Sequence, residues 1–244
     1  MYTVIDPDIA EYLSHWMRHR DPLLDEMESY ARENDFPIIG PLAGAYLYQL
    51  ACMSNAKRVF ELGSGYGYSA YYFLKAVGPT GMVHCTELSE KNIDLARDFL
   101  TRADLWDRVT FHQEDALSAL ERIGGSWDVI FNDIHKHQYP ASIELAYHHL
   151  RPGGLFISDN VLWSGRVLDG KDDGSPDTAA IKEFTRPKGS SRLFFQYGTV
   201  LPSPCGARPR GSFVRSTGET LSFYSQIAFG NDILAAYVWL HSSS

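Results

Sequence analysis

The chain has 244 residues, 44% of them hydrophobic, and a formal net charge of −8 at pH 7. This length and apolar content suffice for one sizeable core, so we expect a single domain over residues 1–244. The acidic balance argues against a nucleic-acid partner and a polybasic membrane anchor, and no apolar run reaches the length of a membrane span.

The first part of the chain is predicted to be helical. Residues 7–35 read as two helical segments, each with a proline near its start, where the missing N–H of proline costs little. Residues 41–54 continue as a mostly apolar helix. We therefore expect N-terminal helices over residues 1–55.

Short apolar runs then alternate with helical segments. The predicted helices span residues 69–76, 89–100 and 143–150, and the predicted strands span residues 58–63, 82–87, 109–114, 127–132 and 155–159. This alternation predicts an α/β fold, with a parallel sheet, right-handed crossovers and helices on both faces. We place the core sheet within residues 56–202. Ligands of such sheets bind beyond the carboxyl ends of the strands, so the residues after each strand are the candidates.

The turn after the first predicted strand is rich in glycine. Its sequence, E-L-G-S-G-Y-G, places Glu61, Gly63, Gly65 and Gly67 in the pattern E-x-G-x-G-x-G. Glycines at such a turn let a ligand approach the backbone closely. A dinucleotide site prefers G-x-G-x-x-G, which this spacing does not fit. A tight turn without a ligand is the alternative.

Acidic residues follow the second and third predicted strands. A carboxylate at Glu87 can accept hydrogen bonds from both ribose hydroxyls of a nucleoside. Glu114, Asp115 and Ala116 stand where they could contact an adenine edge. The alternatives are a helix-start acid favoured by the helix dipole at Glu87, and ordinary helix capping after the third strand.

Hard oxygen donors follow the fourth and fifth predicted strands. Asp133 and Lys136 come after the fourth strand, and Asp159 and Asn160 after the fifth. Three oxygen ligands on two strand ends suit Mg²⁺ or Ca²⁺, and no soft ligand stands with them. A surface ion pair between Asp133 and Lys136, and an Asx turn at Asp159, are the alternatives.

The cysteines and the start of the chain bear on the compartment. Cys52, Cys85 and Cys205 are far apart and odd in number, so they form neither a metal-ligand spacing nor a disulfide framework. The sequence M-Y-T-V-I-D-P-D has acids where a signal peptide needs positive charge. These features predict a reducing, cytoplasmic location.

Three motifs identify a resemblance that covers about residues 30–185. They are R-V-F-E-L-G-S-G-Y-G-Y-S-A, F-N-D-I-H-K-H-Q-Y and G-G-L-F-I-S-D-N-V-L-W-S-G-R-V. They resemble the class I S-adenosylmethionine-dependent, cation-dependent O-methyltransferases, which include caffeoyl-CoA and catechol O-methyltransferases. The resemblance implies a Rossmann-like fold, a mainly parallel seven-stranded sheet and a homodimer.

The resemblance also implies roles for single residues. Lys136 matches the lysine assigned as general base, and Asp133, Asp159 and Asn160 match the metal ligands. Mg²⁺ is the first candidate for the cation, with Ca²⁺ and Mn²⁺ as alternatives. The residues implied to line the cofactor site, for S-adenosylmethionine, are Gly44, Glu61, Gly63, Ser69, Glu87, Asp115, Ala116 and Asp133.

The chain departs from the family pattern at two places. His135 stands where plant-type members carry an acid; we favour an exposed side chain there over a substrate-binding one. The family ends with a strand, a proline and a D-G turn into a final antiparallel strand, of which only T-V-L-P at 199–202 is present. Residues 203–244 are therefore atypical. Divergence, an extra strand and helix, and an altered reading frame all stay open for residues 216–244.

The predicted reaction moves a methyl group from S-adenosylmethionine to a hydroxyl of a catechol-like or hydroxycinnamoyl-type acceptor. A phenol has a pKa near 10, and a bound divalent cation stabilises its oxyanion. Trp163, Tyr139 and the N-terminal helices are candidates for lining the acceptor pocket, with core packing as the alternative. The other candidate functions are a non-catalytic binding module and a nucleotide-dependent enzyme on a similar sheet.

Overall fold

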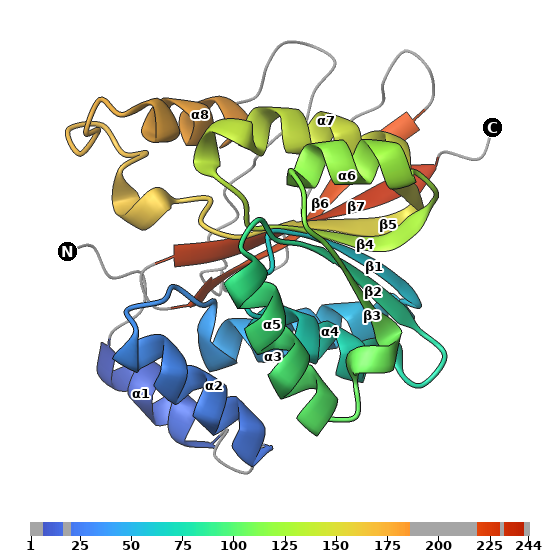
Figure 1. Cartoon of the computed structure of the whole chain (residues 1–244). Helices are drawn as coiled ribbons and strands as arrows, with labels where there is room; N and C mark the ends of the chain where they lie inside the picture. Colours follow the sequence, from blue (N-terminus) through green and yellow to red (C-terminus); the bar gives the residue numbers. More distant parts are fainter. Residues whose placement is uncertain (1–6, 17–20, 186–218, 230–231, 242–244) are drawn as a thin grey trace, which may run out of the picture.

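A computed structural model describes residues 7–16, 21–185, 219–229 and 232–241, and these form an α/β structure with helices on both faces of one sheet (Figure 1). The α-helices are α1 (Pro7–Trp16), α2 (Pro22–Glu33), α3 (Gly40–Met53), α4 (Tyr68–Val77), α5 (Glu90–Arg102), α6 (Ala116–Ile123), α7 (Tyr139–His149) and α8 (Pro176–Thr185). Short 3₁₀ helices are η1 (Trp106–Arg108), η2 (Lys136–Gln138) and η3 (Trp163–Gly165).

The sheet has seven strands in the order β3-β2-β1-β4-β5-β7-β6. Its strands are β1 (Arg58–Leu62), β2 (Met82–Thr86), β3 (Val109–His112), β4 (Trp127–Asn132), β5 (Leu150–Ser158), β6 (Glu219–Phe229) and β7 (Asp232–His241). Strands β1 to β5 pair in parallel, which confirms the predicted fold class. The strand order reverses between β1 and β4, and open α/β sheets bind their ligands at such a switch point.

Two antiparallel strands complete the sheet at one side. β7 pairs with β5 and β6 pairs with β7, so both apolar runs of the segment 216–244, whose structure the sequence left open, are strands. The sheet therefore extends beyond residue 202, where we had expected it to end, and no extra helix replaces either strand. The T-V-L-P segment at 199–202 lies outside the described residues.

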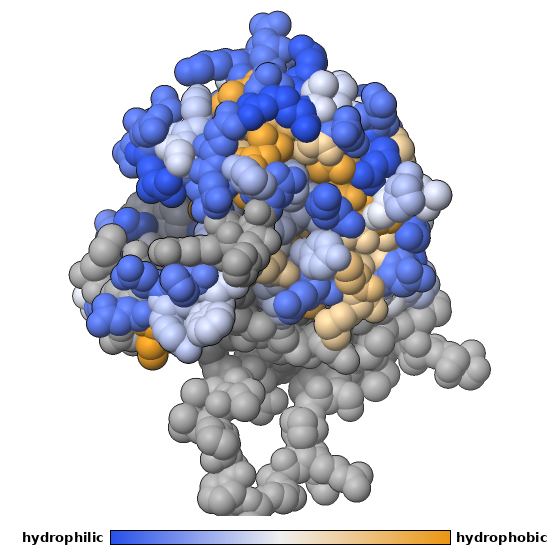
Figure 2. All heavy atoms as spheres, turned by 90° about the horizontal axis from the view of Figure 1, so that it is seen from below, coloured by the Kyte–Doolittle hydropathy of each residue, from blue (hydrophilic) through white to orange (hydrophobic). Residues whose placement is uncertain are grey.

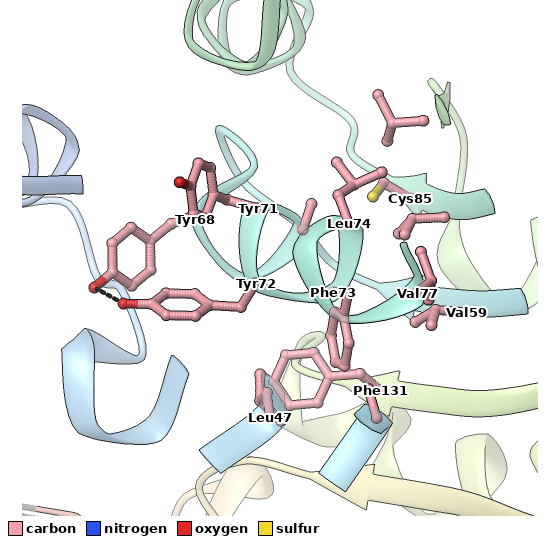
Figure 3. Close-up of a cluster of buried hydrophobic side chains, with 14 of the residues drawn as sticks. Leu47, Val59, Tyr68, Tyr71, Tyr72, Phe73, Leu74, Val77, Cys85 and Phe131 are labelled. Carbon is pink, nitrogen blue, oxygen red and sulfur yellow. Dashed lines mark hydrogen bonds between the residues drawn. The ribbon is translucent and has the colours of Figure 1, made fainter. Parts of the chain in front are cut away.

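The hydrophobic core has two parts, one on each face of the sheet. Helices α3, α4 and α5 cover one face, and α6, α7 and α8 cover the other (Figure 1). Figure 3 shows the first part, where Phe73 of α4 meets Phe131 of β4 with 5.6 Å between ring centroids. Leu47 of α3 lies beside this pair. The near-continuous apolar runs of the central strands follow from burial on both faces.

Hydrogen bonds from three tyrosine hydroxyls hold α2 against this core. Tyr66 donates to the Met27 carbonyl at 2.9 Å, Tyr68 to Glu28 at 2.5 Å, and Tyr71 to Asp21 at 2.6 Å. Asp21 also caps α2, and the Tyr71 hydrogen bond lowers the pKa of this carboxyl. The segment after α2 lies against the glycine-rich turn, because a Cβ on Gly65 would come within 3.0 Å of the Phe36 ring.

Viewed from below, the surface mixes hydrophilic and hydrophobic residues (Figure 2). Scattered apolar groups are ordinary on a protein surface. On α1, however, Ile9, Tyr12, Leu13 and Trp16 are all exposed and recur at helical spacing. None of the helices in the described part of the chain combines the length and the apolar character that crossing a bilayer requires.

Candidate active site

The glycine-rich turn after β1 is shaped by backbone that only glycine adopts readily. Gly63, Gly65 and Gly67 have φ angles of +79°, +54° and +86°. At Gly63 there is also no space for a side chain, since a Cβ would lie 2.4 Å from the backbone oxygen of Asp133. The turn after β1 thus touches the end of β4.

Glu61 is fully buried at the end of β1 and accepts hydrogen bonds from three side chains. Ser64 donates at 3.0 Å, Cys85 lies at 3.4 Å, and Ser69 of α4 donates to the other carboxyl oxygen. Burial raises the pKa of Glu61 to about 7 although these donors oppose the shift, and the nearby charge of Asp133 adds to it. Glu61 and Ser69 were predicted for one site and are in contact, whereas sequence reasoning did not select Ser64 or Cys85.

Gly44 has a packing reason of its own. A Cβ at this position of α3 would lie 2.2 Å from the ring of Tyr72, so the glycine lets α3 and α4 approach each other. The Tyr72 hydroxyl in turn lies 3.4 Å from that of Tyr68 (Figure 3). The structure therefore explains Gly44 through helix packing, whether or not a cofactor also approaches it.

Glu87 and Asp115 follow β2 and β3, at the same edge of the sheet as the glycine-rich turn. Glu87 is half-buried and accepts the N–H of Ser89 at 2.7 Å. Asp115 caps α6 by accepting the N–H of Ser118 at 3.0 Å, which lowers the pKa of Asp115. The other Asp115 oxygen accepts from Gln138 of η2 at 2.7 Å, and Ala116 is buried at the start of α6. The capping alternative for Asp115 is thus part of its role.

Asp133 and Asp159 stand at the tips of neighbouring strands. The N–H of Asp133 donates to Leu62 of β1 at 2.9 Å, and that of Asp159 donates to Asn132 of β4 at 3.1 Å. Since Asn132 pairs with Ser158, the two aspartates are the next residues beyond one register position. The structure therefore brings Asp133 and Asp159 to adjacent backbone positions, as expected for neighbouring parallel strands.

The three residues predicted as metal ligands, Asp133, Asp159 and Asn160, offer side-chain oxygen atoms. Asn160 has φ +53°, and its N–H donates to Asp159 Oδ1 at 2.7 Å, a contact between adjacent residues and not the bond to the residue two positions on that defines an Asx turn. Within the described residues, no three side chains drawn from His, Cys, Asp and Glu form a metal cluster. The set predicted here is two carboxylates and one amide, which suits a hard cation that keeps other positions for water or substrate.

Lys136 points into this region from η2. Its Nζ donates to Asp133 Oδ1 at 3.2 Å, to the Ile134 carbonyl at 3.3 Å and to the Tyr139 hydroxyl at 2.8 Å. Nζ also lies 5.5 Å from the centroid of the Trp163 ring, over its face. Only 9% of Lys136 is exposed, which is unusual for lysine and contradicts a freely solvated side chain.

Two aromatic residues predicted near the acceptor, Tyr139 and Trp163, are at least partly buried, whereas His135 is exposed. Tyr139 is fully buried, and Trp163 is half-buried with an indole N–H that has no partner among the described residues. Both rings flank the Lys136 amine. His135 is exposed, as expected, and its ring stacks on His137 with 5.9 Å between centroids.

The fold and the site together define a class. A parallel sheet with its switch point between β1 and β4, an E-x-G-x-G-x-G turn and polar strand tips are features of S-adenosylmethionine-dependent methyltransferases. The chain belongs to the O-methyltransferase family, whose profile matches residues 18–189. This confirms the resemblance seen in the sequence and favours an enzyme over the binding-module and nucleotide-dependent alternatives.

Individual proteins agree with the family match. A catechol O-methyltransferase of Mycobacterium tuberculosis is 32% identical over 170 residues, which cover 68% of this chain and 77% of that protein. A caffeoyl-CoA O-methyltransferase of Eucalyptus globulus is 29% identical over 153 residues, covering 59% and 58%. The structure of an O-methyltransferase from Bacillus cereus in complex with SAH superposes with a TM-score of 0.71 at 26% identity, covering 95% of this chain and 97% of that one.

Proposed function

We propose that this enzyme methylates a hydroxyl of a catechol-like or hydroxycinnamoyl-type aromatic acceptor with the help of a divalent cation, Mg²⁺ first and Ca²⁺ or Mn²⁺ as alternatives. One observation carries the proposal. The neighbouring tips of β4 and β5 bear Asp133 and Asp159, and Lys136 lies against the first of them. The printed names of the two relatives support a small aromatic acceptor.

The residues at the two tips fit a hard cation. Asp133, Asp159 and Asn160 would hold it, because they offer oxygen atoms from adjacent backbone positions. S-adenosylmethionine, when bound, supplies an electrophilic methyl group on a sulfonium, and the cation stabilises the acceptor oxyanion that attacks it. Two adjacent hydroxyls on one ring could share such an ion, which favours catechols.

Lys136 is proposed to take the proton of the acceptor hydroxyl at Nζ. The amine reaches the Asp133 carboxylate at 3.2 Å, so in its neutral form it stands next to the atoms that would position the acceptor. Its burial excludes the water that would otherwise compete for the proton. Asp133 in this account both offers an oxygen to the cation and orients the base.

The cofactor residues are proposed from their placement around one edge of the sheet. Gly63 is half-buried at the end of β1, where its backbone packs closely on that of Asp133, and Glu61 in the same strand bonds Ser69. Glu87 after β2 is placed to accept ribose hydroxyls, while Asp115 and Ala116 after β3 are placed for the adenine. Gly44 joins this set through the position that it gives to Tyr72.

Methyl transfer to defined acceptors tests the proposal. Mass detection of product is carried out with catechol, caffeic acid and caffeoyl-CoA, after EDTA treatment and again with added Mg²⁺. We expect a product 14 mass units heavier (one CH₂) that disappears with EDTA and returns with Mg²⁺. Turnover that is unchanged under chelation removes the cation from the mechanism. Loss of S-adenosylmethionine binding under chelation would instead place the ion in the cofactor site.

Two further predictions concern the state of the protein. The exposed apolar residues of α1, Ile9, Tyr12, Leu13 and Trp16, support a homodimer, since a second copy could cover them. Light scattering on the wild type and on a Tyr12→Ser, Trp16→Ser variant tests this prediction. A wild-type mass near 27.5 kDa contradicts it.

The second prediction is a reducing, cytoplasmic location. Cys52 and Cys85 are free thiols, which supports it.

A further inference from the structure

Three side chains at the end of β4 recur every third residue. Lys136 begins η2, a 3₁₀ helix over Lys136–Gln138; Asp133 precedes this helix by three residues, and Tyr139 directly follows it. The Lys136 amine contacts both, the Asp133 carboxylate at 3.2 Å and the Tyr139 hydroxyl at 2.8 Å.

The Tyr139 hydroxyl also reaches the neighbouring strand. It donates to the backbone oxygen of Asp159 at 3.2 Å while it accepts from Lys136. This one group thus connects the amine on the β4 side to the residue at the tip of β5. A hydroxyl suits the place because it can donate and accept at the same time.

The ring of Tyr139 is fixed by packing. Tyr139 is fully buried, and its ring meets Phe184 of α8 edge to face, with 5.3 Å between centroids. The Lys136 amine lies over the same ring, 4.8 Å from its centroid. Because packing holds the ring, the Tyr139 hydroxyl has a fixed position, and it can serve as a fixed hydrogen-bond partner for Nζ.

We propose that Tyr139 is a positioning residue for methyl transfer. It fixes the Lys136 amine relative to Asp133 and to the tip of β5, so that the base and the acceptor site keep one geometry. All three N–H donors of a protonated Lys136 have partners, Asp133, Ile134 and Tyr139, and the Tyr139 hydroxyl also donates to the backbone oxygen of Asp159 at the tip of β5. The inference rests on the proposed role of Lys136 as base.

The test compares Tyr139→Phe with Tyr71→Phe in acceptor and cofactor kinetics. Tyr139→Phe keeps the ring and its contact with Phe184 and removes the hydroxyl only. We expect kcat to fall about tenfold, with the acceptor KM and the affinity for S-adenosylmethionine within about twofold of wild type. Tyr71→Phe removes a tyrosine hydroxyl that bonds Asp21 between α4 and α2. It is expected to leave kcat unchanged.

A double-mutant cycle with Lys136→Met shows whether Tyr139 acts through the lysine. The double variant should be no slower than Lys136→Met alone, whereas independent losses that multiply overturn the inference. A crystal structure of Tyr139→Phe should show the Lys136 amine displaced from Asp133, and an unmoved amine also overturns it.

The remaining outcomes separate the two proposals. Wild-type kcat in Lys136→Met overturns the base role and the positioning role together. Wild-type kcat in Tyr139→Phe, with Lys136→Met impaired, overturns the positioning role alone and leaves the proposed function in place.

Discussion

The two ends of β4 carry aspartates with different surroundings. Asp128, near the start of the strand, accepts the N–H groups of Lys57 at 2.6 Å and Arg58 at 2.7 Å, and its other oxygen bonds the Arg151 guanidinium. Asp133, just past the end, receives one donor among the described side chains, the amine of Lys136. The first carboxylate is satisfied by the protein, whereas the second keeps capacity for a ligand.

The pKa of Asp128 agrees with its hydrogen bonds. Burial alone would raise the pKa of Asp128, but the Arg151 bond and the two backbone N–H groups outweigh it, so the pKa is lowered. Asp128 is therefore a charged structural tie between β4, β1 and β5. Asp133, by contrast, has acceptor capacity left over, and this difference is what the variants below test.

The largest expected effect is on kcat, and it comes from removing the Asp133 carboxylate. Asp133→Ala should lower kcat by about 1,000-fold, since a group that stabilises or positions developing charge is lost. The affinity for S-adenosylmethionine and the melting temperature should change little. Calorimetric titration of the cofactor and a thermal scan check both points, with the exposed Asp107→Ala as matched control. If Asp133→Ala lost stability as well as activity, Asp133 would be a structural residue like Asp128, and the proposed difference between them would be contradicted.

Removing the satisfied carboxylate should give the reverse pattern. Asp128→Ala leaves two backbone N–H groups and Arg151 without their acceptor, which should cost about 3 kcal/mol of unfolding free energy. The kcat of the remaining folded enzyme should stay near wild type. Urea unfolding followed by circular dichroism measures the loss. A variant as stable as wild type would contradict the structural role.

A third carboxylate, Glu61, should make the stability of the folded protein depend on pH. Its pKa is about 7 in the folded protein against an ordinary 4.5, so the protonated form favours folding. That contribution is fully present below pH 4.5 and is lost as the pH rises through 7, at a cost of up to about 3 kcal/mol. Glu61→Gln should therefore gain stability relative to wild type between pH 5 and 8. Melting curves across this range check the sign, and parallel curves contradict it.

The last prediction concerns His84, which lies away from the strand tips. His84 lies 3.1 Å from the ring nitrogen of His112, and burial lowers the pKa of His84 from 6.5 to about 4. Its neutral form contributes stability above pH 6.5, and this is lost as the pH falls through 4. His84→Gln should lose less stability than wild type between pH 6.5 and 4, with kcat at pH 7.5 unchanged. A changed kcat would extend the functional region beyond the carboxyl edge.

The sequence predicted most of this fold because its signals are local. Strands β1 to β5 are apolar runs bounded by polar turns, and their alternation with helices implies parallel pairing. The family resemblance implied a seven-stranded sheet, which the structure has, but the residues of the antiparallel pair β6 and β7 were not placed. Apolar runs of about ten residues suit a strand or a helix equally well. The two runs are separated in the sequence by the dipeptide Gly230-Asn231, a pair that is typical of two-residue hairpin turns.

The sequence could predict which site residues follow the ends of strands. It could not predict contacts between residues that are far apart in the chain. Asp133 and Asp159 could be paired because parallel strands end at one edge. That Asp128 is satisfied could not be predicted, because Lys57 and Arg151 are far from it in sequence and meet it only in the folded sheet. The Tyr72 ring against Gly44 is a similar case, decided by how two helices pack.

The most direct test of the account is Mn²⁺ binding followed by electron paramagnetic resonance, with S-adenosylmethionine present. We expect about one bound ion per chain in the wild type and in Asp107→Ala, and loss of that ion in Asp133→Ala and in Asp159→Ala. Unchanged Mn²⁺ binding in both of the latter variants, with folding intact, would contradict a cation at the tips of β4 and β5.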